Sequence, residues 1–219
     1  MNKISICFDL DGTLVNSEES ILFCLEKILK QNNFESKVPL NNNLIGPPLN
    51  DLLKLVSGSS DIDILSSLAA DFNEVYDNDA FKSALPYDGI TELLIFLKSS
   101  KSNVKIATNK RISATNKIIE HLKWNHYFHK VVALDSPNPP FQNKSKMLSY
   151  ILKNNNGKKL VYIGDTINDF IAAKENKINF IGVGWGYGDK EFKNSNEFFV
   201  AESPIQLINY FISNYDGNN

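Results

Sequence analysis

The sequence predicts an α/β fold in which a parallel β-sheet is flanked by helices and carries a helical insertion. Short apolar segments of strand type alternate with helical segments along most of the 219 residues, which is typical of parallel strands joined by helical crossovers. Between residues 16 and 85 only helical patterns occur. With 42% hydrophobic residues, the chain can bury one large domain and a smaller insert.

The expected strands are short and apolar, and helical patterns separate several of them. The strands span residues 4–8, 104–108, 131–134, 160–163, 180–183 and 198–201. The helices outside the insertion span residues 89–98, 113–122, 145–154, 168–175 and 205–213. Because short buried strands joined by helices form parallel sheets with right-handed crossovers, we expect a Rossmann-like core.

The insertion follows the first strand. Its helical patterns cover residues 20–31, 49–56 and 62–76, with no convincing strand between them. The turn sequence Pro86-Tyr87-Asp88-Gly89 then marks the return to the sheet. We therefore expect two units, which are a core formed by residues 1–15 and 86–219 and a helical cap formed by residues 16–85.

The charge of the chain limits the classes of partner. The formal net charge is −2, so no overall basic field favours nucleic acid or a membrane surface. The sequence has no apolar run long enough to span a bilayer, and no basic amino-terminal segment followed by an apolar one. We therefore expect a cytoplasmic protein that acts on a small molecule, with its oligomeric state left open.

Two residue types are scarce. Of the 23 Lys and Arg residues only Arg111 is an arginine, so lysines and backbone amides must do most of the work of binding a phosphate. The two cysteines are Cys7, in the first strand, and Cys24, in a helical pattern. We expect both to be small core residues, because nothing in their spacing indicates a disulfide framework.

The strongest chemical signal lies at the end of the first strand. Asp9 and Asp11 are two residues apart, and Gly12 follows them. If the strand geometry persists, both side chains point to the same side. Two carboxylates held this close repel each other unless they share a cation or a proton, and a hard ion such as Mg²⁺ fits best. An aspartate beside Mg²⁺ can attack a phosphate and form an aspartyl phosphate.

A second acidic signal follows a later strand. Asp165 lies where the strand at 160–163 ends, and Asp169 lies four residues further on, about one helical turn away. Because the carboxyl ends of parallel strands share one edge of the sheet, where ligands bind, Asp165 is expected to join Asp9 and Asp11 in one cluster.

Groups that could bind phosphate occur at two other places. Thr108 and Asn109 follow the strand at 104–108 and lead into a helix, whose amino terminus is a natural phosphate cradle. A lysine must also balance the carboxylates. Lys144, at the start of a helix, is the best placed candidate, and Lys146 is the alternative.

In the order and spacing of these motifs, the chain resembles the haloacid dehalogenase superfamily across nearly its whole length. The segment Asp9-Leu10-Asp11-Gly12-Thr13 is similar to the first family motif, Thr108-Asn109 to the second, Lys144 to the third, and Gly164-Asp165 with Asp169 to the fourth. Residues 45–49, 86–89, 108–110 and 184–188 resemble the phosphoglycolate phosphatase-type subgroup, whose helical cap has a position similar to this insertion.

The resemblance implies a Mg²⁺-dependent phosphatase that acts on a small phosphomonoester such as phosphoglycolate. Asp9 would be the nucleophile and a metal ligand. Asp11 would protonate the leaving oxygen and later deprotonate the water, and its backbone carbonyl would ligate the metal. Asp165 would complete the metal site, while Asp169 would hold this site in place through hydrogen bonds.

The resemblance also implies a set of residues for the substrate. Thr108, the Asn109 backbone and Lys144 would hold the phosphoryl oxygens. Lys110 and Arg111 come next in the chain and are either solvated charges or contacts to the leaving group. The alternating glycines between 182 and 188 do not fit the dinucleotide-binding spacing, and they predict a loop whose backbone lies close to the site.

Several rival functions share the motifs. A dehalogenase and a phosphonate-cleaving relative both depart from the pattern at Asp11, which argues against them. A sugar-phosphate mutase would keep all four motifs, but residues 44–50 contain no basic side chain to grip a second phosphate. A pyrophosphatase and a sugar-phosphate phosphatase remain open. The intact acidic set argues against a non-enzymatic binding module.

Overall fold

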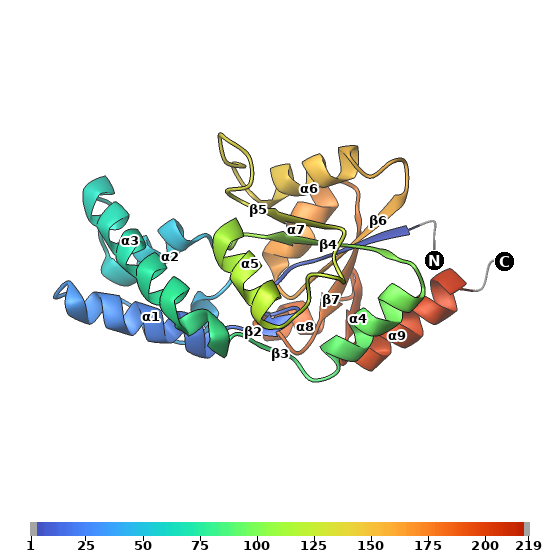
Figure 1. Ribbon diagram of the computed structural model, residues 1–219, viewed down its shortest axis with the longest axis horizontal. Helices are drawn as coiled ribbons and strands as arrows, with labels where there is room; N and C mark the ends of the chain where they lie inside the picture. Colours follow the sequence, from blue (N-terminus) through green and yellow to red (C-terminus); the bar gives the residue numbers. More distant parts are fainter. Residues whose placement is uncertain (1–3, 217–219) are drawn as a thin grey trace.

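The computed structural model describes residues 4–216 and confirms the α/β fold (Figure 1). One sheet is formed by six parallel strands, which are β1 (Ile4–Phe8), β4 (Asn103–Thr108), β5 (Lys130–Ala133), β6 (Lys159–Gly164), β7 (Asn179–Val183) and β8 (Phe199–Ala201). Their order across the sheet is β5-β4-β1-β6-β7-β8. Each is a strand that the sequence predicts. The three strands whose ends carry the acidic and phosphate-binding motifs are therefore neighbours at the centre of the sheet.

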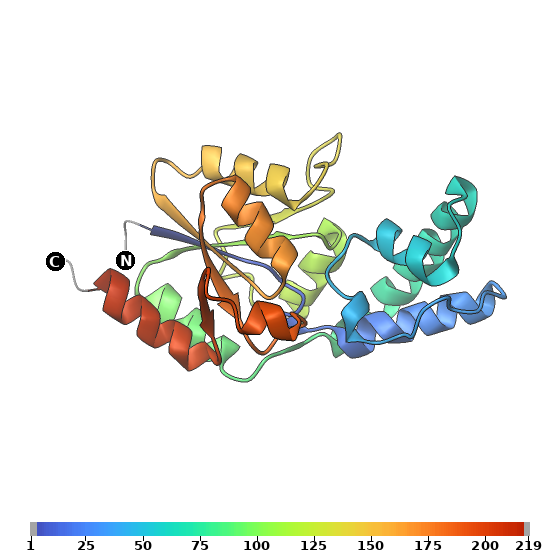
Figure 2. The same ribbon diagram turned by 180° about the vertical axis from the view of Figure 1, so that it is seen from behind.

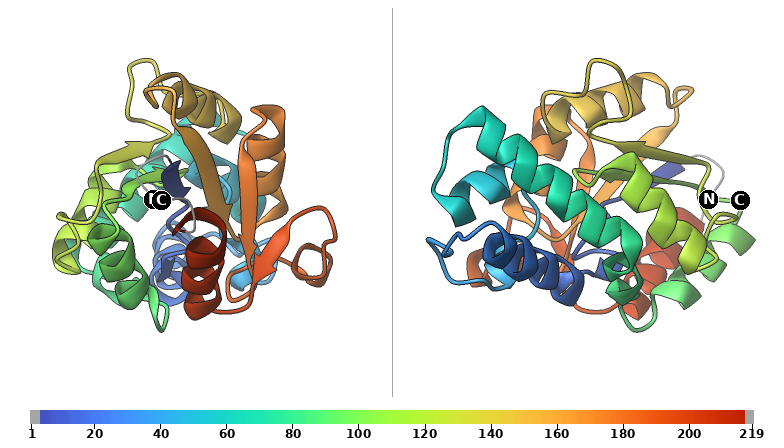
Figure 3. Two further views of the ribbon diagram at one scale, coloured as in Figure 1. Left: turned by 90° about the vertical axis from the view of Figure 1, so that its right-hand side faces the viewer. Right: turned by 60° about the vertical axis from the view of Figure 1, so that its left-hand side comes forward.

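Helices cover both faces of the sheet (Figure 3). One face carries α4 (Ile90–Ser99), α5 (Ile112–His121) and α9 (Pro204–Phe211), and the other carries α6 (Lys144–Lys153) and α7 (Ile167–Glu175). Successive side chains of a strand point to opposite faces of the sheet, so β1 contributes side chains to the helices on both faces. Ile6 and Phe8 pack in the cluster that includes residues of α4 and α9, whereas Cys7 packs with residues of α6 and α7.

Residues 18–84, called the helical segment below, lie at one end of the molecule (Figures 1 and 2). They contain α1 (Glu18–Gln31), α2 (Leu49–Ser57), α3 (Ile62–Asn78) and two 3₁₀ turns at Asn42–Leu44 and Ala80–Ser83. Two short strands, β2 (Val15–Asn16) and β3 (Leu85–Pro86), pair in antiparallel fashion where the chain enters and leaves this segment. The sequence does not predict this pair because two residues are too few to show a period.

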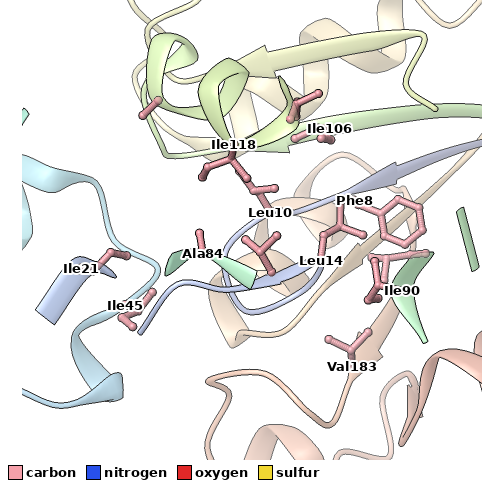
Figure 4. Packing of buried hydrophobic residues seen from close by; sticks show 14 of the residues in the cluster. Phe8, Leu10, Leu14, Ile21, Ile45, Ala84, Ile90, Ile106, Ile118 and Val183 are labelled. Carbon is pink, nitrogen blue, oxygen red and sulfur yellow. The ribbon is translucent and has the colours of Figure 1, made fainter. Parts of the chain in front are cut away.

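A continuous apolar cluster joins the sheet to the helical segment (Figure 4). It includes Phe8 of β1, Leu10 and Leu14 of the turn that follows, and Ile21 and Ile45 of the helical segment. All five side chains are buried. The helical segment therefore packs directly against the carboxyl end of β1, where Asp9 and Asp11 lie.

Two smaller elements complete the fold. Helix α8 (Lys190–Lys193) is capped by the Asp189 side chain, which accepts a hydrogen bond from the Phe192 amide at 2.8 Å. A π-helical turn, Ile212–Asp216, extends α9. Among the helices of residues 4–216, none combines the length and apolar character needed to cross a membrane.

Candidate active site

Asp9 and Asp11 leave the sheet at the carboxyl end of β1. The Asp9 amide still donates to Ile163 O of β6 at 2.8 Å, so strand geometry extends to this residue, whose side chain is buried. Gly12 then turns the chain with a φ of +82°, and a side chain there would collide with the Asp165 carboxylate. Glycine satisfies both the left-handed backbone and the close approach, and the turn packs against Asp165.

Asp169 is fully buried, and its carboxylate is saturated by protein groups. Its Oδ2 accepts hydrogen bonds from the Thr166 amide at 3.1 Å and the Thr166 hydroxyl at 2.7 Å, in a capping box that starts α7. Its Oδ1 accepts from Lys144 Nζ at 2.6 Å and from the Tyr162 hydroxyl at 3.0 Å. These bonds suit Asp169 to positioning Lys144 rather than to direct ligation of an ion.

Asp165 is also fully buried, and two donors orient its carboxylate. The Thr13 hydroxyl donates to Oδ1 at 3.1 Å, and the Tyr187 amide donates to Oδ2 at 2.8 Å. A side chain at Gly186 would collide with Asp165, and one at Gly188 would collide with the Asp165 carbonyl oxygen. The expected glycine loop thus lies with its backbone against the site.

Lys144, and not Lys146, faces the carboxylates. Lys144 is 8% exposed, and its Nζ lies 3.0 Å from Asp9 Oδ1 and 2.6 Å from Asp169 Oδ1. Lys146 is exposed, and its backbone amide donates to the side chain of Asn143, which caps the helix. Burial opposes the charge of Lys144, but Asp169 and Asp9 raise its pKa above the usual lysine value. Lys144 is therefore an ammonium at neutral pH.

The carboxylates at this edge fit a divalent cation. Oxygens of Asp9, Asp165 and Asp169 lie within 4.8 Å of one another, and the Lys144 ammonium contacts two of these carboxylates. Asp9 Oδ1 is close to Lys144 but makes no hydrogen bond within the described chain. Burial raises the pKa of Asp9 well above its usual range and raises that of Asp165 to about 7. A cation held by Asp9 and Asp165 would favour their charged forms, and carboxylate oxygens of this kind suit Mg²⁺.

Asp11, expected in the same cluster, turns its carboxylate elsewhere. Its two oxygens accept from Lys110 Nζ at 3.0 and 3.1 Å. Lys110 also lies over the ring of Tyr76, 4.6 Å from its centroid. Burial opposes the Lys110 charge, but Asp11 and Tyr76 raise its pKa above the usual value. The Asp11 carboxylate is therefore paired with Lys110 and is not one of the clustered carboxylates, which belong to Asp9, Asp165 and Asp169.

The chain after β4 connects the site to the helical segment. The Asn109 side chain donates to Gly46 O at 2.9 Å, and Arg111 lies 2.9 Å from the Asp77 carboxylate of α3. Lys117 of α5 donates to Asp77 O at 2.9 Å. Arg111, expected as a solvated charge or a leaving-group contact, is thus an ion-pair partner of α3.

A cavity of about 80 Å³ lies between the strand ends and the helical segment. Asp9, Asp11 and Thr108 line it on the side of the sheet. Thr108 is buried at the end of β4, and its hydroxyl accepts from the Lys110 amide at 3.1 Å. Six of the sequence-predicted site residues, Asp9, Asp11 and residues 108–111, therefore line one small space that the helical segment covers, whereas Lys144, Asp165 and Asp169 are not among its lining residues.

Some residues of the site were not predicted from the sequence. Tyr162 and Thr13 hold Asp169 and Asp165, and Asn73 and Tyr76 of α3 line the cavity. Tyr162 could have been found as the residue of β6 on the face of α6 and α7, three positions before Asp165. No comparable signal marks Asn73 or Tyr76, because the way α3 docks on the core decides which of its residues face the cavity.

The fold and the acidic cluster are those of a class of hydrolases, which known proteins of similar sequence and structure identify. A model of the haloacid dehalogenase-like hydrolase family matches residues 6–183, and the chain belongs to that family. The phosphoglycolate phosphatase of Aquifex aeolicus is 29% identical, covering 93% of this chain and 94% of that protein. The crystal structure of a predicted phosphatase from Clostridium acetobutylicum has a TM-score of 0.84 and 26% identity, covering 97% of this chain and 100% of that one.

A third relative has a different printed function. The tyrosine-protein kinase PtkA of Mycobacterium tuberculosis is 28% identical over 85% of this chain. This chain spans only 64% of the length of that relative. The family is thus established, whereas the activity is inferred from the site.

Proposed function

We propose that this protein is a Mg²⁺-dependent phosphatase that hydrolyses a small phosphomonoester through an aspartyl phosphate on Asp9. The observation that carries this proposal is the buried Asp9 carboxylate, whose Oδ1 makes no hydrogen bond within residues 4–216 and lies 3.0 Å from Lys144 Nζ. A nucleophilic carboxylate needs a free oxygen, and phosphoryl transfer needs neutralising charge around it. Lys144 and a cation held by Asp9 and Asp165 would supply that charge.

In the first half-reaction, an Asp9 oxygen forms a bond to phosphorus while the bond from phosphorus to the leaving oxygen breaks. Asp11 gives its proton to that oxygen, so the leaving group departs as an alcohol. For this step Asp11 must hold a proton when the ester binds. Once it has given that proton up, Asp11 is again the carboxylate that pairs with Lys110, whose Nζ lies 3.0 Å from Asp11 Oδ1 in the structure.

In the second half-reaction, a water attacks the phosphorus of the aspartyl phosphate. Asp11 takes a proton from this water, and the bond between phosphorus and the Asp9 oxygen breaks. Inorganic phosphate leaves, Asp9 is a carboxylate again, and Asp11 has regained its proton. Each turnover thus consumes one ester and one water.

We propose that three groups of the protein bind the phosphoryl oxygens, which are the Thr108 hydroxyl, the backbone amide of Asn109 and the Lys144 ammonium. When bound, Mg²⁺ neutralises charge on the transferring group. Asp9, Asp165 and the Asp11 carbonyl would hold it, while Asp169 would fix Lys144. The observed hydrogen bonds of Asp169 to Lys144, Tyr162 and Thr166 support this division of roles.

We further propose that residues 16–85 act as a cap over a catalytic core formed by residues 1–15 and 86–219. The position of the cavity between the two supports this, because a cover that closes during chemistry excludes competing water. The small, covered cavity also supports a small metabolite rather than a macromolecule as the substrate. Phosphoglycolate is the first ester to test, because the Aquifex relative is named for it, and pyrophosphate and sugar phosphates are the alternatives.

The test is turnover of p-nitrophenyl phosphate with and without Mg²⁺. We expect Mg²⁺-dependent hydrolysis by the wild type and its loss in Asp9→Asn, because an amide is a poor nucleophile. Asp63→Asn is the matched control, since Asp63 is exposed on α3. Substantial steady-state activity in Asp9→Asn would contradict the covalent mechanism. A wild-type protein that leaves the ester and a wider panel of phosphate esters intact would contradict the function.

A further inference from the structure

Both cations that line the cavity are already neutralised by carboxylates of the protein. Lys110 Nζ lies 3.0 Å from Asp11 Oδ1, and Arg111 lies 2.9 Å from Asp77 Oδ1. Among the described residues that line the cavity, no further Lys, Arg or His occurs. A carboxylate or a second phosphate on the leaving group would therefore be buried beside Asp11 and would have to compete with it for Lys110 once Asp11 has given up its proton, which is unfavourable.

Apart from Asp9 Oδ1, the polar atoms without partners in this cavity include two amide oxygens. Asn73 and Asn109 both line it, and the buried Oδ1 of each makes no hydrogen bond within the described part of the chain. The Asn109 amide nitrogen donates to Gly46 O at 2.9 Å, which fixes its other end as the oxygen. Amide oxygens only accept hydrogen bonds. They call for a donor such as a hydroxyl, and an ionised carboxylate has none to give.

The rest of the cavity lining is mainly apolar. Ile21, Leu52 and Phe72 of the helical segment contribute buried hydrocarbon surface. The Tyr76 hydroxyl, whose polar neighbours are Ser20 and Lys110, also lacks a hydrogen bond of acceptable geometry among residues 4–216. A leaving group with an uncharged carbon skeleton could pack against these apolar side chains. A hydroxyl group on it could form hydrogen bonds with the oxygens that lack partners.

We propose that the leaving group is a short, uncharged alcohol that carries at least one further hydroxyl, so that the substrate is the monophosphate of a small polyol. In this proposal Asn73 is a specificity-determining residue, whose Oδ1 accepts a hydrogen bond from the substrate hydroxyl. The proposal rests on the proposed phosphatase function and names the substrate class of the same site.

Three esters with two-carbon leaving groups test the substrate class. They are 2-hydroxyethyl phosphate, 2-phosphoglycolate, in which a carboxylate replaces the hydroxymethyl group, and ethyl phosphate, which lacks the hydroxyl. We expect kcat/KM for 2-hydroxyethyl phosphate to exceed those for the other two by about tenfold or more, because a site built to pair a hydroxyl discriminates against an analogue without it. Equal or better turnover of 2-phosphoglycolate, or equal turnover of ethyl phosphate, would overturn the proposal.

If the protein is not a phosphatase at all, the same assays give a different result from an error in the substrate class alone. In that case p-nitrophenyl phosphate and all three esters would remain intact with Mg²⁺ present, and both proposals would fall. If p-nitrophenyl phosphate is hydrolysed, the three esters alone decide the substrate class.

Variants of Asn73 test the residue. Asn73→Leu should lower kcat/KM for 2-hydroxyethyl phosphate about tenfold relative to ethyl phosphate, since only the former uses the amide oxygen. Asn73→Lys adds a free cation and should shift the preference toward 2-phosphoglycolate by about tenfold or more. Asn78→Leu, at an exposed position of the same helix, is the matched control and should keep the wild-type ratios.

Ratios between substrates are insensitive to the fraction of folded enzyme, so a partly unfolded variant still gives an answer. Unchanged ratios in both Asn73 variants would overturn the role of this residue.

Discussion

Lys144 and Asp169 form a buried ion pair in which Nζ lies 2.6 Å from Oδ1, with side-chain exposures of 9% and 0%. The same ammonium is 3.0 Å from Asp9 Oδ1. Asp169 thus holds Lys144 next to Asp9. As a result, the position of the Lys144 ammonium does not depend on Asp9 alone.

The ion pair predicts a double effect of Asp169→Asn. Removing one partner of a buried pair leaves the other charge poorly compensated, so we expect the free energy of unfolding to fall by about 3 kcal/mol. Lys144 would then have Asp9 as its only carboxylate, and we expect kcat to fall about tenfold or more. Urea unfolding and initial-rate measurements check the two effects. A variant with wild-type stability and kcat would show that the pair does not position Lys144.

The two lysines at the start of α6 form a natural matched pair. Lys144→Met should reduce kcat about 100-fold or more, because it removes a charge aimed at the transferring phosphoryl group. Lys146→Met should have kcat and stability close to wild type, since Lys146 is exposed. Both are measured with p-nitrophenyl phosphate and by thermal unfolding. Comparable losses of activity in the two variants would refute the assignment of Lys144.

The acidic cluster predicts a strict metal requirement. Mg²⁺ should activate the enzyme, and Ca²⁺ should compete and inhibit, because its larger and looser coordination misplaces Asp9. Asp165→Ala should raise the Mg²⁺ concentration needed for half-maximal activity steeply. Titrations of activity with each ion measure these effects. Full activity after exhaustive chelation, or an unchanged Mg²⁺ requirement in Asp165→Ala, would rule out this site as the metal site.

The two cysteines should be unreactive in the native protein. Both thiols are buried and unpaired. Burial raises the pKa of Cys24 to about 12, and it raises that of Cys7 further. An ordinary thiol is largely thiolate at about pH 9, whereas these two stay neutral and covered. Iodoacetamide labelling followed by mass spectrometry should show no adduct in native protein at that pH and two adducts after unfolding in guanidinium. Rapid native labelling of either thiol would contradict their burial.

The central sheet and the acidic cluster could be predicted because each depends on a short local pattern. Buried strands of parallel sheets are continuous apolar runs, and their carboxyl ends necessarily meet at one edge. This was enough to bring Asp9, Asp165 and Thr108 together from three distant parts of the sequence. The roles of these residues remain proposals.

Features that depend on how elements dock could not be predicted in this way. The choice between Lys144 and Lys146 depends on the rotation of α6 about its axis. Two lysines separated by one residue do not reveal which of them faces the site. The pairing of Arg111 with Asp77 joins two parts of the chain that only tertiary packing brings together. The same holds for Asn73 and Tyr76, whose helix faces the cavity only because the helical segment folds back over β1.

The contacts made just after β4 have a mechanical consequence. Thr108 ends the strand that is proposed to hold phosphate, and the next residues, Asn109 and Arg111, bind Gly46 and Asp77 of the helical segment. The strand end and the helical segment are thus joined over three residues of backbone. We therefore expect occupancy of the phosphate position and the placement of the helical segment to depend on each other.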